Sequence, residues 1–322
     1  MLTGQELIHA LLVPVIVAGP IAAIGRWRCW PWAMPLAAGA GFLTGYALLG
    51  VPSLPPHDGT DWLFWLAIPL TLLAVVEAVV NRFPRGADAE TARTDESIVA
   101  AATPDTPASS TPGRSMRFRS LTPWTWTFGA AAGLVALVIM LPLTRVGSLS
   151  TAATVTTPLL LALAGATLVV LLRFAADRLG PFSTLAGLCI VIAGAGVIIM
   201  SSNLRIVGIY GLAAATAIAP VATLCHDYRA ARAVSIFAIP LLAGLLTAGH
   251  YYPDPGVTWT HFMLILNAPS FLALVAAIPM RRTRVRAALA ILAVGILVGA
   301  VTIPMAIAAK QAAESDPYEA YY

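Results

Sequence analysis

The chain has 322 residues, of which 59% are hydrophobic and 11% are charged, and its mean hydropathy is +0.83. An ordinary soluble domain carries about 25% charged residues, so this composition excludes a water-soluble globular protein. The net charge of +4 does not indicate nucleic-acid binding, because the basic residues follow a membrane pattern. We therefore predict an all-α, polytopic integral membrane protein that contacts the lipid bilayer and binds no nucleic acid.

Ten apolar runs have roughly the 20 residues needed to cross the hydrocarbon core as helices. The predicted ranges are 5–24, 33–50, 62–80, 125–143, 155–173, 184–202, 206–225, 233–249, 260–279 and 286–308. No basic residue precedes the first run, and Arg26 and Arg28 follow it, which is the reverse of a signal peptide. We expect an uncleaved first helix with its N-terminus outside.

One long segment, 84–120, is rich in Pro, Ser, Thr, Ala and charge, and it has almost no apolar surface to bury. This composition is typical of a disordered linker. The chain then divides into three helices in 1–83, the linker, seven helices in 121–310, and a short extracytoplasmic tail in 311–322.

The distribution of Arg and Lys predicts the orientation. With the N-terminus outside, 16 of the 19 basic residues fall inside. The three outside are Arg145, Arg205 and Lys310. This split predicts that both termini lie outside and that the linker is cytoplasmic. The Arg-rich, Ala-rich composition indicates the cytoplasmic (inner) membrane of a bacterium.

Two outer loops share the pattern P-x-x-G-x-x-W, at Pro56–Trp62 and Pro253–Trp259. Their flanks are similar too, with Ala40–Thr44 before the first loop and Ala243–Thr247 before the second. The order of these matches predicts a parallel 4+2+4 internal repeat, in which helices 1–4 and 7–10 are copies. Convergent chemistry is the alternative, because Pro and Gly form turns and Trp favours the membrane interface.

The same two loops carry the candidates for an outer-face site, which are His57, Asp58, Asp61, His250 and Asp254. Histidine and carboxylate side chains bind zinc and act as general acids and bases. Their spacing matches no metal signature such as H-E-x-x-H or C-x-x-C, and loops outside a membrane are polar in any case. We assign no cofactor.

Two further candidates lie inside predicted helices. Glu77 is a carboxylate well inside an apolar run, and an ionisable residue there is a functional hypothesis by default. Its position near the inner end also allows a nearby partner, Asn81 or Arg82, to neutralise it. Asn267 stands beside Pro269 at an expected helix break, where it is a candidate for substrate binding or for packing.

Three G-x-x-x-G patterns, at Gly41–Gly45, Gly129–Gly133 and Gly295–Gly299, predict close helix packing. No phosphate loop, nucleotide fingerprint, haem motif or hydrolase elbow is present, so an enzyme is the least favoured class. The repeat and the prolines inside helices favour permease-like transport of a small solute. The alternative is a non-catalytic subunit or scaffold that packs against other membrane subunits. The third hypothesis is an enzyme with an extracytoplasmic His/Asp site.

Overall fold

The computed structural model describes residues 4–52, 56, 60–80, 123–145, 149–202, 204–253, 256–280 and 282–315. These residues are 88% helical and include no strand, which confirms the all-α prediction for the described part. The predicted linker 84–120 and the end of the predicted tail, 316–322, lie outside the described residues.

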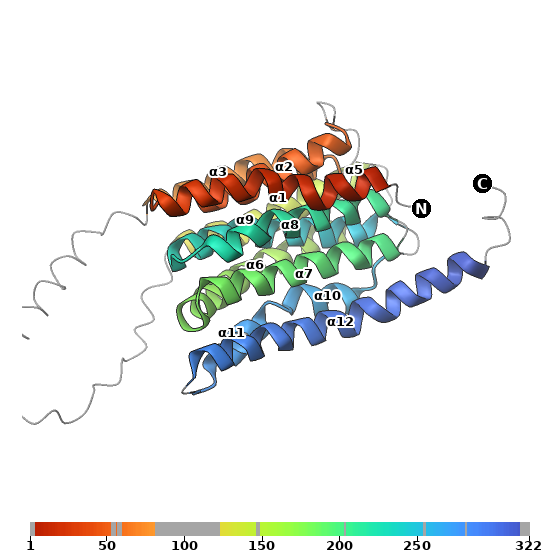
Figure 1. Cartoon of the computed structure of the whole chain (residues 1–322). Coiled ribbons are helices and arrows are strands. Elements are labelled where there is room, and N and C mark those ends of the chain that lie inside the picture. The colour runs from red at the N-terminus through yellow and green to blue at the C-terminus, as the bar shows by residue number, and fades with distance from the viewer. Residues whose placement is uncertain are drawn as a thin grey trace, which may run out of the picture.

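The helices lie side by side along one common direction and form a single bundle (Figure 1). In chain order they are α1 (Gly4–Trp27), α2 (Ala33–Leu49), α3 (Trp62–Val80), α5 (Pro123–Arg145), α6 (Thr151–Leu179), α7 (Pro181–Ser201), α8 (Arg205–Leu224), α9 (Tyr228–Tyr251), α10 (Trp259–Asn267), α11 (Ser270–Ala277) and α12 (Thr283–Ser315).

Seven of these helices are long and apolar enough to cross a membrane, which supports the prediction of a polytopic membrane protein. The bent pair α10–α11 is an eighth crossing if it is one broken span, and α2 and Gly129–Thr144 of α5 are shorter apolar helices. Each predicted run overlaps one of these elements, but the count of ten crossings stays a prediction.

Helix α6 is longer than its predicted range of 155–173. The apolar run ends at Arg173, yet the helix continues to Leu179 and stops at Gly180, whose φ is +90°. The last turns carry Asp177 and Arg178, which hydropathy alone assigns to a loop. In this charged extension Asp177 forms an ion pair with Arg232 of α9.

Helix α9 occupies the centre of the bundle and contacts α2, α3, α5, α6, α7, α8 and α10. Every residue from Ala233 to Gly249 is buried. The two polar side chains of this buried stretch are satisfied within the helix, since Ser235 donates to the carbonyl of Ala231 and Thr247 donates to that of Ala243. Polar contacts to a neighbouring helix occur only near the ends of α9, where Arg232 and Tyr251 contact α6 in the described part of the chain.

The predicted break at Pro269 is present. The axes of α10 and α11 differ by 45° across a break at Ala268 and Pro269. A proline cannot donate a backbone hydrogen bond, so it interrupts the helical ladder. Other prolines lie inside continuous helices, including Pro69 in α3 and Pro240 in α9. A proline by itself therefore does not mark a broken span in this bundle.

Two of the three G-x-x-x-G motifs lie at close helix contacts. A Cβ atom added to Gly41 would stand 2.8 Å from the carbonyl oxygen of Pro14 in α1, and one on Gly133 would stand 2.6 Å from that of Pro158 in α6. The third motif behaves differently. A Cβ on Gly295 of α12 would meet no atom within 4 Å, so this part of the prediction does not hold for contacts within the chain.

The predicted repeat stays a prediction. Its copies would be α1–α2–α3–α5 and α8–α9–α10/α11–α12. Their local structures differ, since α3 is one continuous helix whereas its counterpart is the bent pair. Their surroundings differ as well, because α9 is enclosed on all sides while its counterpart α2 packs mainly against α1, α8 and α3.

Glycine contacts between α7 and α8 provide a test of this packing. A Cβ on Gly196 would lie 2.7 Å from the backbone oxygen of Gly208, so Gly196→Ala must force the two helices apart. We expect it to cost about 1–3 kcal/mol, as overpacking does in protein cores. Gly295→Ala is the matched control, because its methyl group enters open space and Ala favours the helix by about 0.5–1 kcal/mol. Thermal unfolding in detergent should rank the two variants in this order, and equal midpoints would contradict the packing.

Candidate functional site

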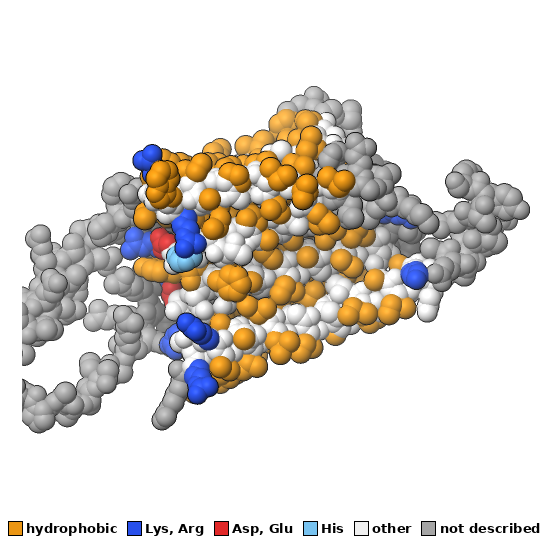
Figure 2. All heavy atoms as spheres, in the orientation of Figure 1, with side chains coloured by type: hydrophobic (Ala, Val, Ile, Leu, Met, Phe, Trp, Pro, Cys, Tyr) orange, Lys and Arg blue, Asp and Glu red, His pale blue; other side chains and the backbone are white. Residues whose placement is uncertain are grey.

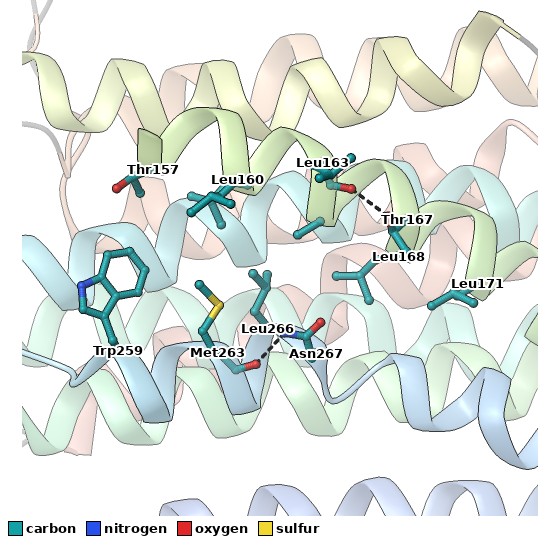
Figure 3. Close-up of a pocket in the computed structure, with 12 residues that line it drawn as sticks. Thr157, Leu160, Leu163, Thr167, Leu168, Leu171, Trp259, Met263, Leu266 and Asn267 are labelled. Atoms are coloured by element: carbon teal, nitrogen blue, oxygen red, sulfur yellow. Dashed lines mark hydrogen bonds between the residues drawn. The ribbon is translucent and has the colours of Figure 1, made fainter. Parts of the chain in front are cut away.

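An apolar groove of about 300 Å³ lies between α6 and α10 (Figure 3). It is lined by Thr157, Leu160, Leu161, Leu163, Ala164, Thr167, Leu168, Leu171, Trp259, Met263, Leu266 and Asn267. The groove exists because α10 bends away from α6 at the break, while α11 packs against α6. Its volume falls in the range of pockets that hold small molecules, roughly 300–1,000 Å³.

Asn267 supplies the amide group of this groove. Its Nδ2 donates to the carbonyl of Met263 at 2.9 Å, and the hydroxyl of Ser270 donates to the Asn267 carbonyl at 2.6 Å. These bonds satisfy backbone groups at the helix break. The side-chain Oδ1 of Asn267 accepts no hydrogen bond from any described residue, and the side chain is exposed. One acceptor therefore stands uncompensated in an apolar groove.

The depth of Asn267 makes this acceptor unusual. The residue sits at the middle of the bent pair, which spans residues 259–277. Its neighbours in the groove are apolar side chains, and a polar group without a partner is costly in such surroundings. The other polar side chains of the groove are engaged, since Thr157 hydrogen-bonds with Tyr251 at 2.8 Å and Thr167 donates to the Leu163 carbonyl at 2.9 Å.

A second groove of about 530 Å³ lies on the other side of α10, toward α12. Its lining includes Leu264, Phe271 and Leu297, and it shares Trp259, Met263 and Asn267 with the first groove. No residue of the central helix α9 lines either groove. Among the described residues, no charged side chain lines them. Both grooves thus suit an uncharged, largely apolar molecule.

The candidate outer-face site is only partly visible. His57, Asp58 and Asp254 lie outside the described residues. His250 is the last-turn residue of α9, and its Nδ1–H donates to the carbonyl of Val257. Asp61 lies directly before α3. Within the described residues no group of three or more His, Cys, Asp or Glu side chains could hold a metal ion, and the site stays a prediction.

The surroundings of His250 are aromatic. Its ring lies 4.5 Å from the Tyr251 ring, 4.4 Å from that of Trp259 and 6.0 Å from that of Phe262, measured between centroids. These contacts and the bond to Val257 fix the start of α10 against the end of α9. The described contacts of His250 therefore position Trp259 at the groove.

Glu77 is buried near the C-terminal end of α3 and forms an ion pair with Arg173 of α6, with 3.1 Å between Oε1 and Nη2. The partner expected from the sequence was a neighbour in the same segment, Asn81 or Arg82, and both lie outside the described residues. Arg173 is 96 residues away, so only the packing of α3 and α6 against the same helix, α9, could identify it. The pair therefore links α3 to α6.

A second ion pair continues this cluster. Arg232 of α9 makes a two-oxygen contact with Asp177, one turn after Arg173. Both side chains are partly exposed, at 27% and 46%. The four residues tie α3, α6 and α9 together at one end of the bundle. Their mutual neutralisation favours a structural role for Glu77 over a role in binding.

Comparison with protein-family models, with curated proteins and with solved structures found no match to this chain.

The buried ion pair gives a quantitative prediction. Glu77→Gln should destabilise the protein by about 3–5 kcal/mol, because it leaves the Arg173 charge without its main partner in a buried position. Replacing both, as Glu77→Leu with Arg173→Met, should cost less than the single change. Asp177→Asn is the control, and we expect at most about 1 kcal/mol because that pair is partly exposed. Unfolding free energies in detergent test the order, and an additive double variant would contradict the coupling.

Proposed function

We propose that the protein is a permease-like membrane protein that binds a small amphipathic solute and moves it across the membrane. The observation that carries the proposal is the acceptor oxygen of Asn267 in an apolar groove at mid-span. Polar groups at such positions mark substrate pathways in membrane proteins. The break at Pro269 beside it supports the same reading, because discontinuous helices frame binding sites in transporters.

The lining of the groove defines the solute class. The described lining carries no charge, so the solute is neutral. Asn267 Oδ1 can only accept, so the solute carries a hydroxyl or an N–H donor. The leucines along α6 and the Trp259 ring suit an apolar body of the size that about 300 Å³ admits. Because the grooves lie on the outer helices, the solute enters sideways from the bilayer.

The second candidate is a membrane subunit that packs against a partner helix. The specific observation in its favour is α12, whose Gly295 faces no neighbour and whose outer residues Ile296 and Ile303 are exposed. Exposed isoleucines are equally compatible with contact to lipid. Only copurification of a partner protein would therefore support this second candidate. Purification in a gentle detergent with a stoichiometric second protein would favour it over transport. An enzyme with its site on the outer His/Asp loops ranks third.

Groove-filling variants test transport. Vesicles containing the purified protein would be screened with neutral amphipathic alcohols and amides, and uptake compared with empty vesicles. Thr167→Trp fills the groove from its exposed side and should reduce uptake at least about ten-fold, the equivalent of 1.4 kcal/mol. Asn267→Leu should reduce it roughly two- to ten-fold, the range of one hydrogen bond. Leu292→Trp is the control, since this exposed residue lines neither groove. Uptake equal to that of empty vesicles for every solute would reject the proposal.

The orientation is also part of the proposal. Most of the described arginines gather at one end of the bundle (Figure 2), while Arg205 lies at the opposite end, at the start of α8. By the positive-inside rule the arginine-rich end is cytoplasmic in a bacterial inner membrane. The predicted start and end of the chain then lie outside. Arg173, Arg232 and Arg286 belong to this arginine-rich end.

Cysteine labelling tests the orientation. Cys29 is exposed in the turn after α1, at the arginine-rich end. Cys225 is buried after α8, and burial raises the pKa of its thiol to about 12, so it stays protonated at pH 7.5. Maleimides react with the thiolate. A variant with Cys29 as its only cysteine should react with an impermeant maleimide in inside-out vesicles alone, and one with only Cys225 should react after unfolding. Labelling of Cys29 in right-side-out vesicles would invert the assignment.

A further inference from the structure

The arginine-rich end of the bundle is divided into two parts with different electrostatics. In one part, Arg173 and Arg232 face Glu77 and Asp177 in ion pairs. In the other part, the end of α6 meets the start of α12, and no ion pair forms among the described residues there. The arginines of this second part are Arg178, Arg282, Arg284 and Arg286, which we call the α6–α12 arginine cluster.

Arg286 organises the cluster. Its side chain is buried, with 8% of the residue exposed, and its Nη2 donates to the backbone oxygen of Arg178 at 2.6 Å. That oxygen belongs to the last turn of α6, where carbonyl groups lack helical partners and carry partial negative charge. The Nε of Arg286 is buried and has no hydrogen-bond partner in the described part of the chain. The bond places the start of α12 beside the end of α6.

The remaining arginines of the cluster face outward. Arg282 and Arg284 are exposed at the first turn of α12, and the Arg178 guanidinium lies 5.3 Å from the centroid of the Phe174 ring. Four positive charges thus share a small region. Such a concentration is unfavourable unless an anion compensates it. The N-terminus of α12, with its unpaired N–H groups, adds to the positive potential.

The surface next to the cluster is apolar and exposed. Leu274 and Ile278 of the α11 end are 62% and 44% exposed, and Val285 of α12 is 46% exposed. These residues lie on both sides of the turn that carries the arginines. A charged patch bordered by apolar surface at a membrane boundary matches a molecule with an anionic head and hydrocarbon chains. A free inorganic anion would use only the charged part.

We infer that the α6–α12 arginine cluster binds the phosphate group of an anionic phospholipid, whose acyl chains lie along Leu274, Ile278 and Val285. Basic pockets between membrane helices on the cytoplasmic side bind such headgroups. Arginine suits phosphate because its planar guanidinium donates two parallel hydrogen bonds. The inference is independent of transport, since neither groove includes these arginines.

The test counts bound lipid on the full-length protein. The protein is purified in mixed micelles with equal amounts of phosphatidylglycerol and phosphatidylcholine, and retained lipid is measured by native mass spectrometry. The cluster variant is Arg282→Gln with Arg284→Gln. The control is Arg26→Gln with Arg28→Gln, which removes the same charge from two exposed arginines at the end of α1. Arg286 is unchanged in both, because its buried side chain holds the end of α6.

We expect the wild-type protein and the control to retain phosphatidylglycerol over phosphatidylcholine. The cluster variant should bind it roughly 25-fold more weakly, at about five-fold for each arginine removed near an anionic surface. Equal loss in both variants would show that the lipid follows total charge, and it would overturn the site. Unchanged binding in the cluster variant would overturn it as well. Displacement of the lipid by millimolar glycerol phosphate or inorganic phosphate would overturn the lipid assignment in favour of a soluble phosphate ligand.

Discussion

Close contact between helix backbones holds this bundle together, because lipid is as apolar as the helix surfaces and offers no hydrophobic reason for them to associate. Glycine makes that contact possible at Gly41, Gly133 and Gly196, where an added methyl group would collide with backbone atoms of a neighbouring helix. The contacts enclose α9 so completely that every residue from Ala233 to Gly249 is buried. Because the centre is densely packed, both grooves and the α6–α12 arginine cluster lie on the helices around it.

Charge is arranged by the same packing. Glu77 and Arg173 lie 96 residues apart, and they meet because α3 and α6 run beside α9 at the arginine-rich end. Helix α6 continues beyond its apolar run to Leu179, and a hydrogen bond from Arg286 to the Arg178 carbonyl joins its end to α12. One half of the end is thereby neutralised within the protein, while the α6–α12 arginine cluster relies on the membrane for its counterions.

The two proposals use different surfaces. The groove at Asn267 lies at mid-span and is uncharged, which suits a neutral solute with one hydrogen-bond donor. The arginine cluster lies at the boundary and is charged, which suits a phosphate headgroup. Helix α12 links them, because it borders the second groove through Leu297 and carries Arg286 at its start. A lipid held at its first turn therefore restrains the helix that flanks the solute groove.

The sequence by itself determined the membrane class, the positions of the apolar helices and the break at Pro269, because these depend on local hydropathy and on the missing N–H of proline. It also singled out Glu77 and Asn267 as polar residues in apolar surroundings. Only the tertiary structure decided that Glu77 pairs with Arg173, that α9 is central, and that Gly295 meets no neighbour within the chain. Hydropathy measures how readily a segment transfers from water into lipid, and it does not measure contact with other helices. Helix α12 is more apolar than α9, yet α12 is mostly exposed and α9 is almost wholly buried. Which helix faces lipid depends on long-range packing, which local sequence patterns do not encode.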